Sequence, residues 1–165
     1  MSAVVTPQPV IKRKTFKYQT ELSWLVARAG MLESDGKPDL RVSSPPEFHG
    51  ESGVWTPEDL YIGAINACTM STFLAFAEKK KLKILSYESK AVGILEFQDG
   101  KYWFTHVTVK PRIIVNSIEC AALAEETILE AHQNCFLSNS IKSMVNVEPD
   151  ISVRDTLTIK GQEIL

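Results

Sequence analysis

The fold is decided by the stretch TPEDLYIGAINACTMSTFLAFAEKKKL, residues 56–82. It begins with residues that favour a helix start: Thr56 as the N-terminal cap, Pro57 at the first helical position, and then the acidic Glu58. It ends with lysines at 79–81, which complement the negative end of the helix dipole. The pattern predicts one long helix of roughly 40 Å over residues 56–82.

The middle of this predicted helix, residues 60–76, contains no charged side chain and has no clean polar face. A helix that is apolar all round has to be buried on all sides. In a chain of 165 residues, the chain's own sheet can cover only part of such a helix. We therefore expect a second chain to cover the rest.

Strand-like segments precede the helix. Residues 15–27 favour aromatic and β-branched side chains with rough alternation, which is typical of a strand. The turn dipeptide Asp35-Gly36 predicts a hairpin that returns through residues 40–42. Residues 43–54 are rich in Ser, Pro and Gly and predict a long loop, whereas residues 1–14 predict a loose tail.

Two long strand-like runs follow the helix, at 84–97 and 102–115, and the turn at residues 98–101 predicts a hairpin between them. A second helix is expected over 118–132, capped by Asn116 or Ser117, with its glutamates on one face and alanines on the other. One or two closing strands are expected over 144–160, interrupted at residues 149–150. The order predicts a single α+β domain with antiparallel sheet over residues 15–165.

Composition excludes several classes of function. The formal net charge of −2 argues against a protein that binds nucleic acid or a membrane surface, because both rely on a positive field. No run of about eighteen apolar residues is present, so no membrane span is expected, and the N-terminus does not resemble a secretory signal. Three widely spaced cysteines do not form a disulfide framework, which favours reduced thiols and a cytoplasmic location.

Each of these cysteines, taken alone, is most simply a small core residue. Cys68 lies in the middle of the long helix among small side chains, and Cys120 lies in the first turn of the second helix. Cys135 directly follows the second helix. Only the sequences around Cys68 and Cys135 suggest that this pair does more than pack in the core.

These surroundings are TPEDLYIGAINAC, ending at Cys68, and AHQNCFLSN, which contains Cys135, Ser138 and Asn139. They resemble the two cysteine motifs of the OsmC/Ohr family, the osmotically inducible and organic-hydroperoxide-resistance proteins. The family also has an arginine near the N-terminus, and Arg28 in the sequence Arg-Ala-Gly fits that position. The resemblance covers residues 20–155 and is strongest for the broad group of OsmC-like proteins.

The resemblance implies an OsmC/Ohr fold, with antiparallel sheets around a long buried central helix in an intertwined homodimer. It also implies a thiol-dependent peroxidase that reduces organic hydroperoxides, with catalytic residues Cys68, Cys135, Arg28 and Glu58. In the implied cycle, Cys68 is oxidised by the peroxide and forms a disulfide with Cys135. A dithiol such as a lipoyl group on a carrier protein then reduces this disulfide. No cofactor and no metal are required.

Geometry adds an expectation about how the site is assembled. Cys68 needs a nearby cation to become a thiolate, because it lies a dozen residues inside its helix, where the dipole offers little. Arg28 is the proposed cation, oriented by Glu58 through a two-pronged ion pair. Since ten residues of helix separate Glu58 from Cys68 by about 15 Å, we expect Arg28 and Glu58 to come from the partner subunit.

Alternatives stay open at this point. His132 and Cys135 have the spacing of half a zinc site, but the chain has no CxxC and no matching second half. His132 as the base of a cysteine hydrolase lacks an evident third group to orient it. The same fold could serve a redox-sensing or small-molecule-binding dimer, with cysteines that signal oxidation or only fill the core.

Overall fold

The computed structural model describes residues 14–154. Residues 1–13 of the predicted tail and residues 155–160 of the predicted closing strand lie outside the described residues. The chain forms two compact units, one ending at Trp55 and the other beginning at Thr56. The two units are described in turn.

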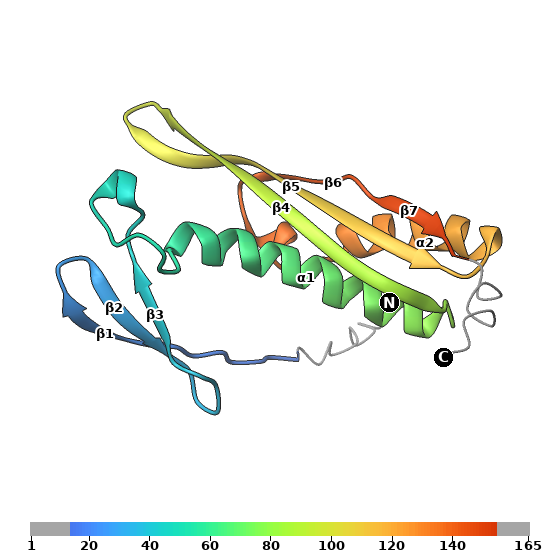
Figure 1. Ribbon diagram of the computed structural model, residues 1–165, viewed down its shortest axis with the longest axis horizontal. Helices are drawn as coiled ribbons and strands as arrows, with labels where there is room; N and C mark the ends of the chain where they lie inside the picture. Colours follow the sequence, from blue (N-terminus) through green and yellow to red (C-terminus); the bar gives the residue numbers. More distant parts are fainter. Residues whose placement is uncertain (1–13, 155–165) are drawn as a thin grey trace, which may run out of the picture. The chain divides into compact units, whose positions relative to one another are not determined.

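The first unit is a three-stranded antiparallel sheet of β1 (Glu21–Val26), β2 (Ala29–Glu33) and β3 (Leu40–Ser43), in that order (Figure 1). The predicted hairpin at Asp35-Gly36 is confirmed, and Gly36 has the left-handed φ of 70° that such a turn uses. β1 is shorter than predicted, because a second tight turn at Ala27 leads the chain directly into β2. The expected loop contains one short helical turn, η1 (Pro46–Phe48).

The second unit begins with the long helix α1 (Pro57–Lys79). Its start is as predicted: the Thr56 side chain accepts a hydrogen bond from the backbone N–H of Asp59, and the Asp59 carboxylate accepts one from the N–H of Thr56. The helix ends three residues earlier than expected. Lys81 adopts a left-handed φ of 55°, and the N–H of Leu82 closes the helix end on the carbonyl of Ala77.

β4 (Ile84–Gln98) and β5 (Lys101–Val115) form the predicted antiparallel hairpin. Its turn residues Asp99 and Gly100 both have left-handed φ angles, 51° and 81°, which suits the right-handed twist of the flanking strands. Figure 1 shows this hairpin as the longest part of the sheet, running across α1. The hairpin is therefore the frame on which the second unit is built.

The chain continues through α2 (Ile118–Gln133), η2 (Ser138–Ser140), β6 (Met144–Val147) and β7 (Asp150–Val153). β6 and β7 both pair with β5 in parallel. The expected antiparallel sheet is thus right for β4 and β5 but wrong for the closing strands. The reason is topological: the crossover through α2 brings the chain back to run alongside β5 in the same direction.

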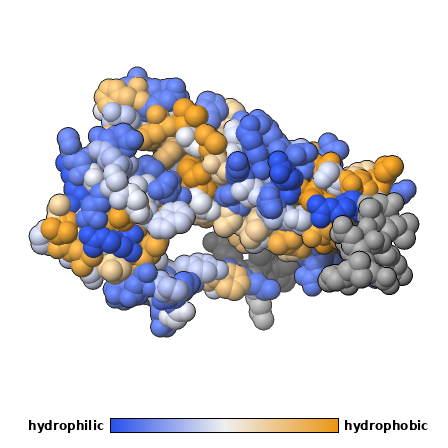
Figure 2. Space-filling model, in the orientation of Figure 1, coloured by the Kyte–Doolittle hydropathy of each residue, from blue (hydrophilic) through white to orange (hydrophobic). Residues whose placement is uncertain are grey.

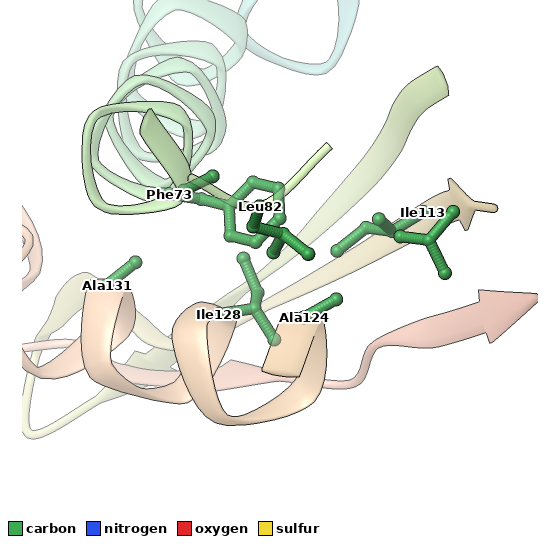
Figure 3. Packing of buried hydrophobic residues seen from close by; sticks show 8 residues of the cluster. Phe73, Leu82, Ile113, Ala124, Ile128 and Ala131 are labelled. Carbon is green, nitrogen blue, oxygen red and sulfur yellow. The ribbon is translucent and has the colours of Figure 1, made fainter. Parts of the chain in front are cut away.

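The main hydrophobic core of the second unit lies where α1, α2 and the sheet meet (Figure 3). Phe73 from α1, Ile128 from α2 and Ile113 from β5 are completely buried in it. The predicted division of α2 is confirmed, since Ala124, Ile128 and Ala131 face this core while its glutamates face outward. Both helices are therefore held on one face of the same sheet.

α1 is buried on one stripe only, formed by Ile65, Thr69, Phe73 and Ala77. Leu74 on another face is 40% exposed, and Figure 2 shows that hydrophobic residues reach the surface of the molecule. By length and composition alone, α1 meets the criterion for a helix that crosses a bilayer. The core helix of a soluble protein meets the same criterion, so this finding does not contradict the expectation that no segment spans a membrane.

Candidate functional site

The second unit brings two of the predicted site residues together. Cys68 lies in the fourth turn of α1, and Cys135 lies in the loop that directly follows α2. Their thiols lie close enough for each to shift the pKa of the other. Both cysteines are free. A reduced sulfur on α1 and one in the loop after α2 therefore lie near each other.

The surroundings of Cys68 disfavour its thiolate. Burial raises the pKa of the Cys68 thiol above its ordinary value, and the hydrogen bond with Cys135 raises it further. The backbone N–H of Leu137 and the hydroxyl of Thr72 act in the opposite direction but do not outweigh these two effects. The thiol of Cys68 thus keeps its proton more tightly than a free cysteine does.

Cys135 has the opposite character, although it is completely buried. Burial alone would raise the pKa of its thiol. The nearby Ser138 hydroxyl and Cys68 thiol, and then the N–H groups of Ser138 and Leu137, lower the pKa of the Cys135 thiol below its ordinary value. Of the two thiols, Cys135 is the one whose pKa the second unit lowers.

The loop around Cys135 is fixed by its own hydrogen bonds. The N–H of Cys135 bonds to the carbonyl of His132 at 3.3 Å, which continues the end of α2. The N–H of Asn139 bonds to the carbonyl of Cys135 at 3.1 Å, and the Asn139 side chain donates to the carbonyl of Gln133 at 2.9 Å. These contacts turn the chain back on itself and hold the sulfur of Cys135 against α1.

Glu58 lies in the first turn of α1, as predicted. Its atom Oε2 is buried and has no hydrogen-bond partner among residues 14–154. A buried carboxylate oxygen without a partner is costly, so this side chain is suited to receive a donor such as a guanidinium. Along α1, Glu58 is ten residues from Cys68, which is about 15 Å.

Arg28 lies in the first unit, at the turn between β1 and β2. Its side chain is exposed, and its guanidinium donates a hydrogen bond to the carbonyl of Phe48 at the end of η1. Because Arg28 belongs to the first unit and Glu58, Cys68 and Cys135 to the second, the geometry that relates Arg28 to the sulfurs stays a prediction.

The remaining candidates from the sequence are Cys120, His132 and a metal site. Cys120 packs against the main core, and its backbone N–H donates to the Ser117 side chain that caps α2. His132 has a buried Nδ1 without a hydrogen-bond partner among the described residues. Between residues 14 and 154, no three His, Cys, Asp or Glu side chains are grouped closely enough to hold a metal ion.

Sequence reasoning assigned no role to three groups near the two sulfurs, namely Thr72, Leu137 and Ser138, although Ser138 was noted as part of the second cysteine motif. Thr72 could have been found from its spacing, since it is four residues after Cys68 and so lies on the same helix face. Ser138 could have been found as a hydroxyl three residues after a cysteine, the spacing of an N-terminal cap. The backbone N–H of Leu137 leaves no signal in sequence.

Comparison with known proteins places this constellation in a family. The family model described as OsmC-like protein matches residues 50–150, which include both helices, both cysteine motifs and strands β4, β5 and β6 of the second unit. This chain belongs to the OsmC-like family. The resemblance inferred from the two cysteine motifs is thereby confirmed, and so is the α+β fold that it implied.

Solved structures with the same fold include several OsmC-like proteins. An OsmC-like protein of unknown function from Vibrio cholerae O1 biovar eltor is 26% identical, with a TM-score of 0.75 over 82% of this chain and 99% of that one. An organic hydroperoxide resistance protein OsmC from Legionella pneumophila, described as a predicted redox protein, is 25% identical, with a TM-score of 0.63 over 84% of this chain and 100% of that one.

An organic hydroperoxide resistance protein from Elizabethkingia anophelis is 23% identical, with a TM-score of 0.66 over 86% of this chain and 100% of that one. At this identity the likeness shows the fold alone. No curated protein matches the chain. The OsmC-like relatives thus include proteins named for hydroperoxide resistance and proteins of unknown function.

Proposed function

We propose that this OsmC-like protein is a thiol-dependent peroxidase that reduces organic hydroperoxides in the cytoplasm. The observation that carries the proposal is the proximity of the free thiols of Cys68 on α1 and Cys135 in the loop after α2, which lie in the two cysteine motifs. Two reduced sulfurs that lie close together can be oxidised to a disulfide with little movement of the chain. The names of the hydroperoxide-resistance relatives support the same chemistry.

In the proposed cycle, the Cys68 thiolate attacks the distal oxygen of the hydroperoxide and breaks the O–O bond. The alkoxide leaves and takes a proton to become an alcohol, and Cys68 becomes a sulfenic acid. The Cys135 thiolate then attacks the Cys68 sulfur and expels the hydroxyl group as water. The two protein sulfurs have been oxidised together, and the peroxide has been reduced to an alcohol and water.

The first step needs a cation, because the second unit by itself raises the pKa of Cys68. Arg28 is the group that we propose to supply it, with its guanidinium paired to Glu58. The unpartnered buried oxygen of Glu58 supports this pairing. A fixed positive charge beside the sulfur favours the thiolate and offsets the effects of burial and of Cys135.

The site is completed in a homodimer, in which Arg28 and Glu58 of one subunit serve Cys68 and Cys135 of the other. Support comes from α1, which leaves a second face of small and apolar residues exposed: Gly63, Ala64, Ala67, Met70, Ser71, Leu74 and Ala75. Small side chains allow another helix to approach closely. The 15 Å between Glu58 and Cys68 along the helix points in the same direction.

Steady-state consumption of cumene hydroperoxide, driven by dihydrolipoamide, tests the activity. The Cys68→Ser variant should lose turnover, whereas the matched Cys120→Ser variant should keep it, because Cys120 packs in the core away from the sulfur pair. Equal rates for Cys68→Ser and the unmodified protein would refute the assignment. Mass analysis after one equivalent of peroxide should show two hydrogens lost, mapped to Cys68 and Cys135.

Mixing two inactive variants tests whether the sites are shared. A heterodimer of one Cys68→Ser subunit and one Arg28→Ala subunit contains one site with all four groups intact only if Arg28 acts on the partner's sulfur. We expect co-refolding of the two variants to restore up to about half of the activity per intact heterodimer. If Arg28 acts within its own chain, no activity returns.

The raised pKa of Cys68 also favours a second candidate, a redox sensor on the same fold in which oxidation is slow and signals rather than turns over. The two functions differ in the number of turnovers. A peroxidase sustains many cycles with a dithiol reductant, whereas a sensor stops after one equivalent of peroxide per site. A progress curve with excess peroxide and reductant separates them.

A further inference from the structure

The turn that follows Cys135 gathers hydrogen-bond donors around its sulfur. Residues 136–140 form a tight turn that includes η2, held by bonds from the N–H of Ser140 to the carbonyl of Leu137 at 2.9 Å and from the N–H of Asn139 to that of Cys135. In such a turn, the first N–H groups point back toward the residue that precedes it. Those of Leu137 and Ser138 are directed at the Cys135 side chain. Cys135 thus directly precedes this turn, and its thiol pKa is lowered by these N–H groups.

The hydroxyl of Ser138 adds a third donor. Its oxygen is buried and has no hydrogen-bond partner in the described chain apart from its approach to the Cys135 sulfur. A buried hydroxyl is normally paired, because leaving it unpaired costs free energy. A thiolate at Cys135 would accept a hydrogen bond from the Ser138 hydroxyl. This hydroxyl is not explained by packing or by the capping of η2, for which no side-chain hydrogen bond exists.

The two sulfurs also differ in access. Cys135 is completely buried, whereas Cys68 is only half-buried in the described structure. In thiol–disulfide exchange, the incoming thiolate approaches one sulfur from the side opposite the bond that breaks, and the sulfur with the lower thiol pKa leaves faster. The greater exposure of Cys68 and the lower thiol pKa of Cys135 therefore both favour attack on the Cys68 sulfur, with the Cys135 sulfur as the leaving group.

We propose that the dithiol reductant attacks the sulfur of Cys68, and that Ser138 together with the N–H groups of Leu137 and Ser138 receives the departing thiolate of Cys135. This inference rests on the proposed function for its physiological setting, and it assigns Ser138 as a positioning residue for the reductive half of the cycle. The matching reductant is a flexible dithiol, because only its second sulfur can then complete the exchange without a further protein group.

The step balances as follows. One thiolate of the reductant forms a bond to the Cys68 sulfur, the bond between Cys68 and Cys135 breaks, and its electron pair leaves on the Cys135 sulfur. The second thiolate of the reductant then attacks its own first sulfur, and Cys68 is released as a thiolate. The reductant ends as a cyclic disulfide, oxidised by two electrons, and the two protein sulfurs are reduced.

The first experiment maps the attacked sulfur. The purified full chain is oxidised with diamide, which forms the disulfide without peroxide. It is then treated briefly with 2-mercaptoethanol in the presence of N-ethylmaleimide, which captures the released thiolate. Peptide mass spectrometry should find mercaptoethanol on Cys68 and maleimide on Cys135. The reverse pattern, equal labelling of the two, or a disulfide that resists mercaptoethanol overturns the proposal.

This design separates the two proposals. If diamide forms the disulfide and peroxide does not, the proposed peroxidase function fails while the direction of attack is still tested. If peroxide forms the disulfide and mercaptoethanol is found on Cys135, the direction of attack fails while the peroxidase function stands.

The second experiment isolates the role of Ser138 by a pH titration. In a Cys68→Ser, Cys120→Ser background, Cys135 is the only thiol, and the ultraviolet absorbance of its thiolate reports its pKa. Ser138→Ala should raise that pKa by about one unit, the scale of one hydrogen bond to a charged group. Ser138→Thr should keep it low. Ser140→Ala is the matched control, because the Ser140 hydroxyl donates to the carbonyl of Phe136 at 2.7 Å instead.

In the protein with all its cysteines, Ser138→Ala should slow the reduction of the disulfide about threefold, given Brønsted coefficients near one half. A structural role alone would change stability without moving the titration. An unshifted Cys135 pKa in Ser138→Ala, or an equal shift in Ser140→Ala, overturns the assignment of Ser138.

Discussion

The two helices of the second unit differ in how completely their apolar side chains are buried. α2 divides its surface: its alanines and Ile128 face the core, and its glutamates face outward. α1 is apolar on nearly every face of its middle turns, yet the described chain buries only the stripe through Ile65, Thr69, Phe73 and Ala77. α2 is therefore complete within one chain, whereas α1 has an apolar face left over. This difference indicates that α1 has an apolar face suited to a second packing contact.

Substitutions in the buried faces of the two helices should lower the free energy of unfolding to a similar extent. They have the largest effect that we expect. Phe73→Ala should lower the free energy of unfolding by about 3–5 kcal/mol, and Ile128→Ala by about 2–5 kcal/mol, since both side chains are fully buried in the shared core. Urea denaturation measures both. Phe136→Ala is the control: this ring is 79% exposed, and its loss should change stability by less than about 0.5 kcal/mol. A small effect at Phe73 would contradict the shared core.

The exposed faces should differ, and a matched pair of leucines tests this. Leu74 on α1 is 40% exposed and Leu129 on α2 is 45% exposed. Leu74→Asp should convert the proposed dimer to monomer at micromolar concentration, because it would place a charge in the apolar contact that we propose between chains. Leu129→Asp should leave the dimer intact. Analytical ultracentrifugation gives the answer, and two variants that behave alike would remove the distinction between the helices.

The N-terminal caps provide a smaller contrast. Thr56 caps α1 reciprocally with Asp59, whereas Ser117 caps α2 through a single side-chain bond to the N–H of Cys120. Thr56→Ala should therefore cost about 1–2 kcal/mol and Ser117→Ala about 1 kcal/mol of unfolding free energy. Thermal unfolding of the two variants under identical conditions measures the difference. A larger loss at Ser117 would reverse the expected order.

The smallest effect on stability is expected for the ion pairs that connect the two helices. Lys80, which caps the end of α1, forms ion pairs of 2.8 Å with Glu126 and 2.7 Å with Glu130 of α2. The hydrogen bonds to Glu126 and Glu130 raise the pKa of Lys80. The contribution of this network is therefore present at neutral pH and is lost as the pH rises through the raised pKa of Lys80.

Lys80→Ala should cause only a small fall in Tm at neutral pH, because exposed pairs are screened by solvent. The difference from the unmodified protein should vanish at strongly alkaline pH and shrink in high salt. Differential scanning calorimetry across pH and salt gives both dependences. A difference that grows with salt would show that Lys80 acts through packing of its alkyl chain.

Local signals in the sequence predicted most elements closely. The Thr56-Pro57 start of α1, the Ser117 cap of α2 and the turn at Asp99-Gly100 were all found correctly, because each depends on residues a few positions apart. The errors have two kinds of cause. The parallel pairing of β6 and β7 with β5 follows from the crossover of α2, which is non-local, whereas the early end of α1 follows from a local feature, the left-handed turn at Lys81.

For the site, the motifs identified Cys68 and Cys135 as a pair, but not which sulfur is the better thiolate. Sequence reasoning expected Cys68 to be the activated one. The second unit instead lowers the pKa of Cys135 and raises that of Cys68. Activation of Cys68 then depends on a charge from outside this unit, which is the role proposed for Arg28.

The sequence by itself determined the family, the long apolar helix and the two cysteines proposed to react, because spacing and helix-start chemistry are encoded in short stretches of chain. Only the tertiary structure decided that these cysteines lie near each other and that Ser138 and the N–H of Leu137 lower the pKa of Cys135. The physical reason is that a thiol pKa depends on burial and on donors brought in by folding. These groups lie on segments that pattern analysis treats separately.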